Sequence, residues 1–176
     1  TSVYPLGSEV KILLFTFISF GLLGLLDDAK KTFAWVKKGF FGLRLRHKLI
    51  LEIILACIVG FWLVHDLKIN ILHIPLLGVF HLGWWYIPFA VFVIIAFANA
   101  FNITDGLDGL SAGVLVIALF AFWFLSASIL DTVLSIFIAL WIGGVLAFLY
   151  FNVLPSRIFL GDVGALSFGA TFAVVG

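Results

Sequence analysis

The chain has 176 residues and a mean hydropathy of +1.29; 64% of its residues are hydrophobic and only 11% are charged. Soluble globular domains are about 45–50% apolar and about 25% charged, so this composition excludes a soluble domain. It predicts an all-α integral membrane protein, folded as a polytopic helical bundle. The net charge of +1 provides no strong basic field, and nucleic acid is not expected as a partner.

Apolar segments follow one another along the whole chain. A membrane-spanning helix needs about 20 predominantly apolar residues. We expect five complete spans and the beginning of a sixth that is truncated at Gly176, over residues 10–26, 49–64, 87–98, 110–130, 133–151 and 163–176. Residues 69–75 alternate enough to allow an extended segment in the connector 65–85. No repeat or linker is found, so residues 1–176 are predicted to form a single transmembrane domain, part of a longer polytopic protein.

Three polar segments interrupt the apolar pattern. They are residues 25–31 (LLDDAKK), 99–113 (NAFNITDGLDGLSAG) and 152–162 (NVLPSRIFLGD). A polar turn between two apolar segments is costly unless water or a ligand satisfies its polar groups. These segments are called polar segments one, two and three below, and they are the candidate functional elements.

The distribution of basic residues predicts the orientation of the spans. Seven of the ten Lys and Arg residues lie in the connector after the first span, between residues 30 and 48. The positive-inside rule places this connector in the cytoplasm. Counting spans from there places all three polar segments on the cytoplasmic face, which predicts one composite site at that membrane surface.

The acidic residues have structural interpretations as well as functional ones. Asp27 and Asp28 follow the first span, where a helix C-terminus disfavours negative charge, so they are either a solvated loop start or a pair that binds Mg²⁺ or moves a proton. Asp105 fits a turn, whereas Asp108 and Asp162 fit helix N-caps. Glu52 is interpreted mainly as an ion-pair partner of a nearby basic residue.

The polar segments together resemble a known family. The segments GLLDDAKK, GLRLRHKLILE, YIPFAVFVIIAFANAFNITDGLDGLSAG and YFNVLPSRIFLGDVGALSFG occur in this order between residues 24 and 169. They are similar to the phospho-N-acetylmuramoyl-pentapeptide transferases, a branch of the polyprenyl-phosphate N-acetylhexosamine-1-phosphate transferase superfamily. The resemblance covers the middle of the family's chain, without its first spans and its late histidine-rich loop.

The resemblance implies a reaction and a set of residue roles. A phospho-sugar passes from UDP-MurNAc-pentapeptide to undecaprenyl phosphate with release of UMP, with Mg²⁺ as cofactor, in the bacterial cytoplasmic (inner) membrane. Asp27, Asp28 and Asp162 would be catalytic; Asp162 and Asp28 would hold the metal, and Asp27 would act as base or nucleophile. The substrate-binding residues implied are Asn99, Asn102, Asp105, Asp108, Asn152, Phe159, Lys31 and Lys48. The resemblance leaves a homodimer open.

Three alternatives remain at this stage. A sister transferase would move GlcNAc-1-phosphate or a related sugar phosphate to a polyprenyl phosphate. An ion-coupled transporter would also carry membrane carboxylates, but transporter sites lie near the bilayer midplane, whereas these carboxylates lie at span ends. A purely structural membrane subunit would leave three polar segments on one face unexplained.

Overall fold

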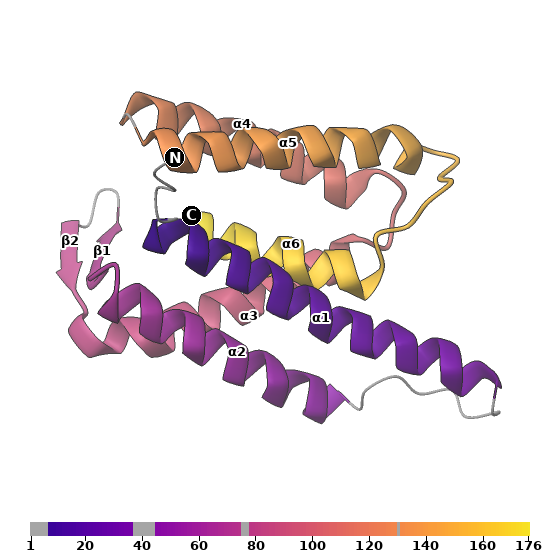
Figure 1. The fold of residues 1–176 in the computed structure, drawn as a ribbon, viewed down its shortest axis with the longest axis horizontal. Helices are drawn as coiled ribbons and strands as arrows, with labels where there is room; N and C mark the ends of the chain where they lie inside the picture. Colours follow the sequence, from indigo (N-terminus) through magenta and orange to yellow (C-terminus); the bar gives the residue numbers. More distant parts are fainter. Residues whose placement is uncertain (1–6, 37–44, 75–77, 130) are drawn as a thin grey trace, which may run out of the picture.

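The computed structural model describes residues 7–36, 45–74, 78–129 and 131–176, with residues 33–36 described by their backbone alone. Its helices are elongated and lie side by side along a common direction (Figure 1). In chain order the elements are α1 (Ser8–Val36), α2 (Leu45–His65), β1 (Ile71–Ile74), β2 (Gly78–His81), the 3₁₀ turn η1 (Gly83–Trp85), α3 (Tyr86–Thr104), α4 (Leu110–Ser128), α5 (Thr132–Asn152) and α6 (Gly161–Val175).

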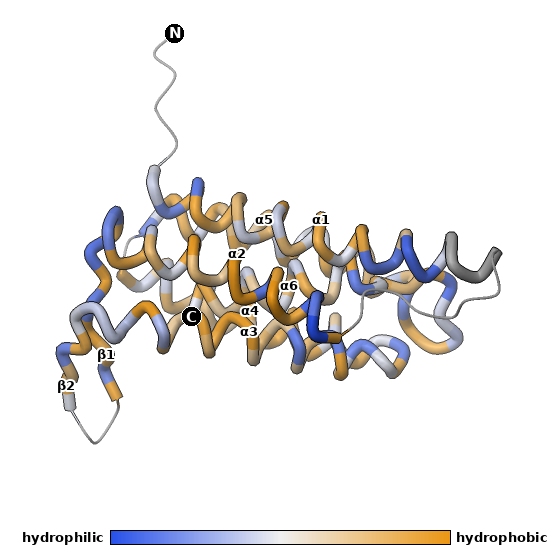
Figure 2. Tube along the Cα trace, turned by 90° about the horizontal axis from the view of Figure 1, so that it is seen from below, coloured by the Kyte–Doolittle hydropathy of each residue, from blue (hydrophilic) through white to orange (hydrophobic). Residues whose placement is uncertain are grey.

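Five of these helices are long and apolar enough to cross a membrane, and α6 is a shorter apolar helix. This confirms the predicted all-α polytopic fold and its five spans. Large apolar side chains such as Ile117 and Leu140 remain more than 70% exposed in mid-helix, as expected for surfaces that face lipid tails. Figure 2 shows the hydrophobic residues along the helices and the hydrophilic ones concentrated toward their ends.

The helices pack around two apolar clusters. The first joins α1, α2, α3 and α6 through residues such as Phe20, Val59, Ile94 and Leu166. The second joins α4 and α5 through residues such as Leu119, Ile138 and Val145, with aromatic side chains of α3 and α6 packed against it. Helix α6 therefore lies between the two clusters, against α1 on one side and α3 on the other (Figure 1).

Small residues allow α6 to approach its neighbours closely. A Cβ added to Gly169 of α6 would lie 2.6 Å from the backbone oxygen of Phe97 in α3. A Cβ added to Gly24 of α1 would overlap the backbone of Asp162 in α6. Backbone-to-backbone contact at small residues is a common way for helices to associate in lipid, where apolar burial alone gives little driving force.

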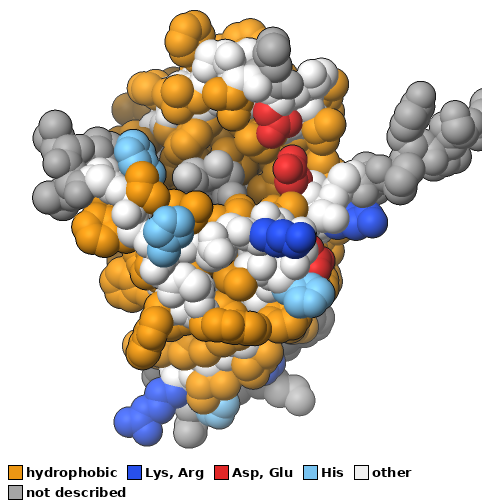
Figure 3. Space-filling view, turned by 90° about the vertical axis from the view of Figure 1, so that its left-hand side faces the viewer, with side chains coloured by type: hydrophobic (Ala, Val, Ile, Leu, Met, Phe, Trp, Pro, Cys, Tyr) orange, Lys and Arg blue, Asp and Glu red, His pale blue; other side chains and the backbone are white. Residues whose placement is uncertain are grey.

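The connections between helices gather at two opposite ends of the bundle (Figure 1). One end holds the turn between α3 and α4, the loop between α5 and α6, the C-terminal end of α1 and the start of α2. The other holds the α4–α5 turn and an antiparallel hairpin in which Ile71 pairs with His81 and Ile74 with Gly78. The hairpin contains the extended segment that the sequence allowed within residues 69–75. Figure 3 shows this end of the bundle, which carries few charged side chains.

The predicted ends of the first and third spans are wrong. The third span was expected to end at Ala98, but α3 continues to Thr104, so Asn99 and Asn102 lie inside a helix. The first span was expected to end at Leu26, with Asp27 and Asp28 at its C-terminal end, but α1 continues without a break to Val36. The aspartates therefore lie inside a helix. Lys31 lies 3.0 Å from Asp27 on the same helix face, and this ion pair one turn apart favours continued helix over a turn.

Candidate active site

The first and third polar segments meet where α1 crosses α6. Glycine at position 24 lets the two backbones touch, because any side chain there would overlap Asp162. The backbone N–H of Val163 donates a hydrogen bond to Asp28 Oδ2 at 3.2 Å. Gly161 has a φ of 66°, and a Cβ there would lie 2.9 Å from the same oxygen. Glycine is therefore favoured at both crossing positions, and the crossing brings the aspartates of two distant segments together.

A cluster of three carboxylates and two ammonium groups forms at this crossing. Lys31 and Lys48 each place Nζ 2.8 Å from the same oxygen of Asp162, Oδ2. Asp27 Oδ2 lies 3.0 Å from Lys31 Nζ and 3.6 Å from Lys48 Nζ. Asp28 Oδ1 lies 3.6 Å from Lys31 Nζ. Three helices, α1, α2 and α6, contribute to this cluster, which we call the ion cluster.

The ion cluster is partly withdrawn from solvent. The Asp27 residue is 3% exposed and Lys48 is 8% exposed, whereas the side chain of Lys31 is 48% exposed. Burial disfavours the ionised form of Asp162, but the hydrogen bonds that Lys31 and Lys48 donate to it outweigh burial and hold the pKa of Asp162 below its ordinary value of 3.8. The cluster therefore keeps Asp162 ionised, and its two lysines provide the positive charge that an anionic substrate would need.

The second polar segment forms the turn between α3 and α4 beside the ion cluster. The Ser111 hydroxyl donates a hydrogen bond to Asp105 Oδ1. Burial raises the pKa of Asp105, the hydrogen bond from Ser111 opposes this rise, and the negative charge of Asp162 adds to it. The two carboxylates are therefore near enough to interact electrostatically, which links the second segment to the third.

Two hydrogen bonds join the second segment directly to the third. Asn152, at the end of α5, accepts from the backbone N–H of Gly109 at 2.9 Å and donates to the backbone oxygen of Ile158 at 2.9 Å. Asp108 Oδ2 accepts from the backbone N–H of Ser156 at 3.2 Å. The turn after α3 and the loop after α5 are thus held against each other, and all three polar segments meet at one end of the bundle, as the sequence predicts.

The N-cap interpretations of two aspartates are wrong. The N-cap of α4 is Gly109, in the left-handed conformation with φ 76° and no side-chain cap, while Asp108 binds Ser156. The N-cap of α6 is Leu160, and Asp162 lies in the first turn. Both carboxylates are consequently used for contacts between segments, and the positive end of the α6 dipole favours the charge of Asp162.

The remaining predicted residues lie at the same end but differ in exposure. Asn99 donates to Glu52 Oε2 of α2 at 2.6 Å and is half-buried. Asn102 is half-buried in the last helical turns of α3. Phe159 is 74% exposed in the loop before α6, so it is available to a ligand and does not belong to the apolar core.

Three residues at the site have structural roles that the sequence alone does not reveal. Glu52 was interpreted mainly as an ion-pair partner of a nearby basic residue, but its carboxylate accepts from Asn99 and it is completely buried. Ser111 and Gly24 were not singled out. An acid inside an apolar run, four residues after Lys48, is the signal in the sequence that could have drawn attention to Glu52, because i and i+4 share a helix face.

The crossing offers Asp28 and Asp162 as oxygen ligands for the expected magnesium ion. Among the described residues, no group of three or more His, Cys, Asp or Glu side chains is arranged to hold a metal ion. Mg²⁺ commonly takes only one or two protein carboxylates, together with water and substrate phosphates. Asp28 and Asp162, which flank Lys31, fit that smaller requirement by chemistry and proximity.

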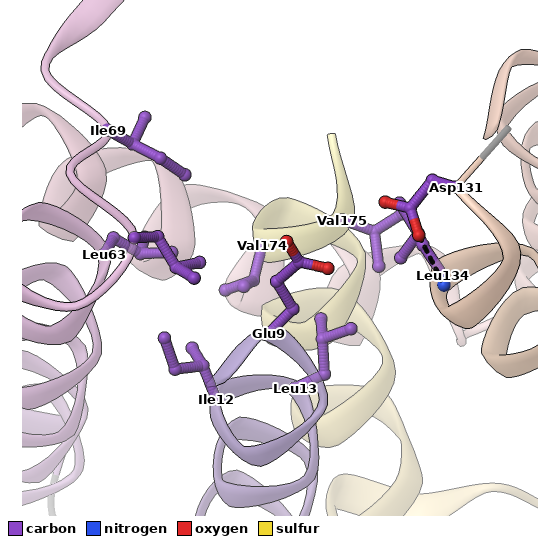
Figure 4. Close-up of a pocket in the computed structure, with 10 residues that line it drawn as sticks. Glu9, Ile12, Leu13, Leu63, Ile69, Asp131, Leu134, Val174 and Val175 are labelled. Atoms are coloured by element: carbon purple, nitrogen blue, oxygen red, sulfur yellow. Dashed lines mark hydrogen bonds between the residues drawn. The ribbon is translucent and has the colours of Figure 1, made fainter. Parts of the chain in front are cut away.

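One apolar cavity that also holds charged groups lies elsewhere. A cavity of about 260 Å³ opens at the hairpin end of the bundle, where the carboxylates of Glu9 and Asp131 lie among apolar side chains that include Ile12, Leu63 and Val175 (Figure 4). It is at the opposite end from the ion cluster. The candidate active site is therefore identified by its converging charges and hydrogen bonds.

Comparison with known proteins is consistent with this arrangement. The model of glycosyl transferase family 4 matches residues 10–176. The chain is similar to proteins named phospho-N-acetylmuramoyl-pentapeptide-transferase. The relative from Caldanaerobacter subterraneus subsp. tengcongensis is 36% identical over 171 residues, 97% of this chain and 53% of the relative. Those from Bacillus mycoides and Clostridium novyi are 38% and 34% identical, covering 97% and 95% of this chain and 52% and 51% of the relatives.

The extent of these matches settles the family. The chain spans about half the length of the curated relatives it matches. The family model nevertheless covers nearly all of the chain, including α1 through α6 and all three polar segments. The chain therefore belongs to glycosyl transferase family 4.

Proposed function

We propose that the full-length protein containing this chain transfers phospho-N-acetylmuramoyl-pentapeptide from its UDP carrier to undecaprenyl phosphate and releases UMP. The names of the similar proteins support this substrate pair. The observation that carries the proposal is the ion cluster, in which Asp27 and Asp28 of α1 meet Asp162 of α6 across more than 130 residues of sequence. Two lysines accompany them, as a reaction between two anionic phosphates requires.

Lys31 and Lys48 are proposed to provide the positive charge that the substrate phosphates need. Lys31 is the more exposed and can leave its carboxylate partners to contact a pyrophosphate, whereas Lys48 is buried and holds Asp162 in place. Asp27 either takes the proton of the lipid phosphate, whose oxygen then attacks the β-phosphorus and displaces UMP, or attacks the β-phosphorus itself. In the second case UMP leaves first, and the lipid phosphate then displaces Asp27 from the phospho-sugar. Asp28 and Asp162 would hold Mg²⁺, which would neutralise pyrophosphate charge when bound.

The second segment and its neighbours are proposed to form the nucleotide-sugar pocket. Asn99, Asn102, Asp105 and Asp108 lie on the last turns of α3 and in the α3–α4 turn, where Asp105 feels the charge of Asp162, and Phe159 offers an exposed ring for a base or sugar. Asn152 is only 3% exposed and uses its amide on two backbone partners. We therefore assign Asn152 the part of holding the pocket walls together.

The orientation follows from charge. The basic residues between positions 30 and 48 favour a cytoplasmic location for the end that carries the ion cluster. Soluble UDP-sugars would reach the site from that side, while the lipid phosphate would reach it along the membrane. The chain is proposed to act as a single transmembrane domain of the bacterial cytoplasmic membrane, and a homodimer stays a prediction.

The test is UMP release by the full-length protein in detergent with Mg²⁺ and undecaprenyl phosphate. UDP-MurNAc-pentapeptide and UDP-GlcNAc are offered separately. Release with the first substrate alone is expected. Release with UDP-GlcNAc alone would keep the chemistry and replace the substrate by that of a sister transferase. Folded protein that releases UMP with neither would overturn the proposal and return an ion-coupled transporter, which a flux assay would detect.

A further inference from the structure

A buried acid outside the ion cluster contacts one of the proposed pocket residues. Glu52 lies on α2, one helical turn after Lys48, and is 0% exposed inside a membrane-spanning helix. Its Oε2 accepts a hydrogen bond from Asn99 Nδ2 at 2.6 Å, and its Oε1 has no hydrogen-bond partner among the described residues. A buried acid in a span is costly and commonly functional, and the reaction described above gives Glu52 no part.

The contacts of Asn99 fix which way its amide points. Nδ2 donates to Glu52 and also to the backbone oxygen of Ile95 at 3.0 Å. A backbone carbonyl can only accept, so the nitrogen of the amide must face Ile95. The opposite orientation would place the amide oxygen against a carbonyl and a carboxyl oxygen at the same time. Both hydrogens of the amide are therefore used, and the carbonyl oxygen Oδ1 is the atom left over.

Glu52 also connects this amide to the ion cluster. Lys48 lies on the same face of α2, attracts Glu52 electrostatically, and places its ammonium group 2.8 Å from Asp162. Because Glu52 is completely buried and hydrogen-bonded to Asn99 of α3, its side chain has little freedom to reorient. It can therefore hold Asn99 of α3 in a constant position relative to the α1–α6 crossing.

We propose that Glu52 is a positioning residue that fixes the Asn99 amide, so that Asn99 presents only a hydrogen-bond acceptor and recognises an N–H or O–H group of the nucleotide-sugar. This inference rests on the proposed function. It gives Asn99 a defined polarity, because a freely rotating asparagine would bind a hydrogen-bond donor and a hydrogen-bond acceptor of the ligand equally well. A ligand group that offers only oxygen acceptors would be rejected at this position.

The test uses the full-length protein and separates the two substrates. Glu52→Leu removes one of the two acceptors that hold the Asn99 amide and leaves only the Ile95 carbonyl; we expect the KM for UDP-MurNAc-pentapeptide to rise about tenfold, the loss of roughly one hydrogen bond. The KM for undecaprenyl phosphate should stay unchanged. Glu52→Gln keeps an acceptor oxygen and should recover most of the affinity. The matched control is Thr171→Val, which replaces another buried polar side chain far from the site.

A double-mutant cycle tests the coupling. Asn99→Ala should raise the same KM, and adding Glu52→Leu to it should cause no further rise. An unchanged KM in Glu52→Leu, an equal defect in Glu52→Gln, or full additivity in the cycle would each overturn the inference. If Glu52→Leu does not fold, Asn99→Asp replaces it, because a carboxylate cannot donate to Glu52 or to Ile95; an unchanged KM there would be equally decisive.

Failure of the proposed function gives a different result. In that case the wild-type protein releases no UMP, whatever residue stands at position 52. The pair is then tested through melting temperatures of the wild type, both single variants and the double variant. Non-additive losses support the coupling of Glu52 to Asn99, and additive losses overturn it.

Discussion

Gly24 of α1 lies directly against the backbone of Asp162 in α6, and the Cβ of any other amino acid at position 24 would overlap that backbone. The contact sets how closely the two helices cross. Asp27, one turn further along α1, consequently shares the ammonium groups of Lys31 and Lys48 with Asp162. The geometry of the ion cluster thus depends on a residue that carries no chemistry.

Substitution of Gly24 should separate the two helices. Gly24→Ala would overpack the crossing, and we expect it to cost about 1–3 kcal/mol of stability and to lower activity by moving Asp27 and Asp28 away from Asp162. Gly113→Ala is the matched control, because a Cβ there meets no atom within 4 Å and alanine favours a helix. Thermal unfolding in detergent measures the stability of both variants. Equal melting temperatures would contradict the close contact between Gly24 and Asp162 at the crossing.

Loss of the Asp162 charge should abolish most of the activity. Asp162→Asn leaves Lys31 and Lys48 facing a neutral amide and removes a proposed metal ligand. We expect the rate of UMP release to fall by about 10²–10³-fold with the protein still folded. Asp131→Asn is the control, because that aspartate caps α5 at the opposite end and asparagine caps equally well. Full Mg²⁺-dependent turnover in Asp162→Asn would remove Asp162 from the site.

The two lysines should differ in their effect on stability. The side chain of Lys48 is 10% exposed and that of Lys31 is 48% exposed, although both lie 2.8 Å from Asp162 Oδ2. Exposed ion pairs contribute about 0–1 kcal/mol, whereas removal of one partner from a buried pair costs more. Lys48→Met should therefore lower the melting temperature more than Lys31→Met does. A larger loss of melting temperature in Lys31→Met than in Lys48→Met would contradict the burial of the Lys48 ion pair.

Asp105 should give the stability a pH dependence of defined sign. Burial raises its pKa above the ordinary 3.8, so the folded protein binds this proton more tightly than the unfolded chain. The associated stability is present at pH values below the unfolded pKa and is lost as the pH rises above 3.8 through the raised folded pKa. Asp105→Asn should lack this loss.

The measurement is the difference in melting temperature between wild type and Asp105→Asn across that pH range. As the pH increases, the melting temperature of the wild type should fall relative to that of Asp105→Asn. Ser111→Ala provides a second check: it removes the hydrogen bond that lowers the pKa of Asp105, so the transition should shift to higher pH. A difference that stays constant with pH would contradict the burial of Asp105.

Local sequence identified the elements of this protein but misjudged their ends. Apolar length predicted the five spans, since each span must cover the same bilayer thickness. Apolar length failed at Asp27, because the charged pair Asp27 and Asp28 resembles the end of a span. The helix continues there, stabilised by the ion pair between Asp27 and Lys31. The N-cap interpretations of Asp108 and Asp162 failed for a related reason: a cap can be replaced by a contact from a distant segment.

The sequence by itself determined the membrane class, the three polar segments and, through the alternation of spans, their gathering at one end of the bundle. Only the tertiary structure decided which side chains touch. The pairings of Asn99 with Glu52, and of Asn152 with Gly109 and Ile158, depend on the rotation and depth of each helix against its neighbours. Hydropathy constrains length along the membrane normal and leaves rotation free, and rotation is set by close contacts at residues such as Gly24 and Gly169.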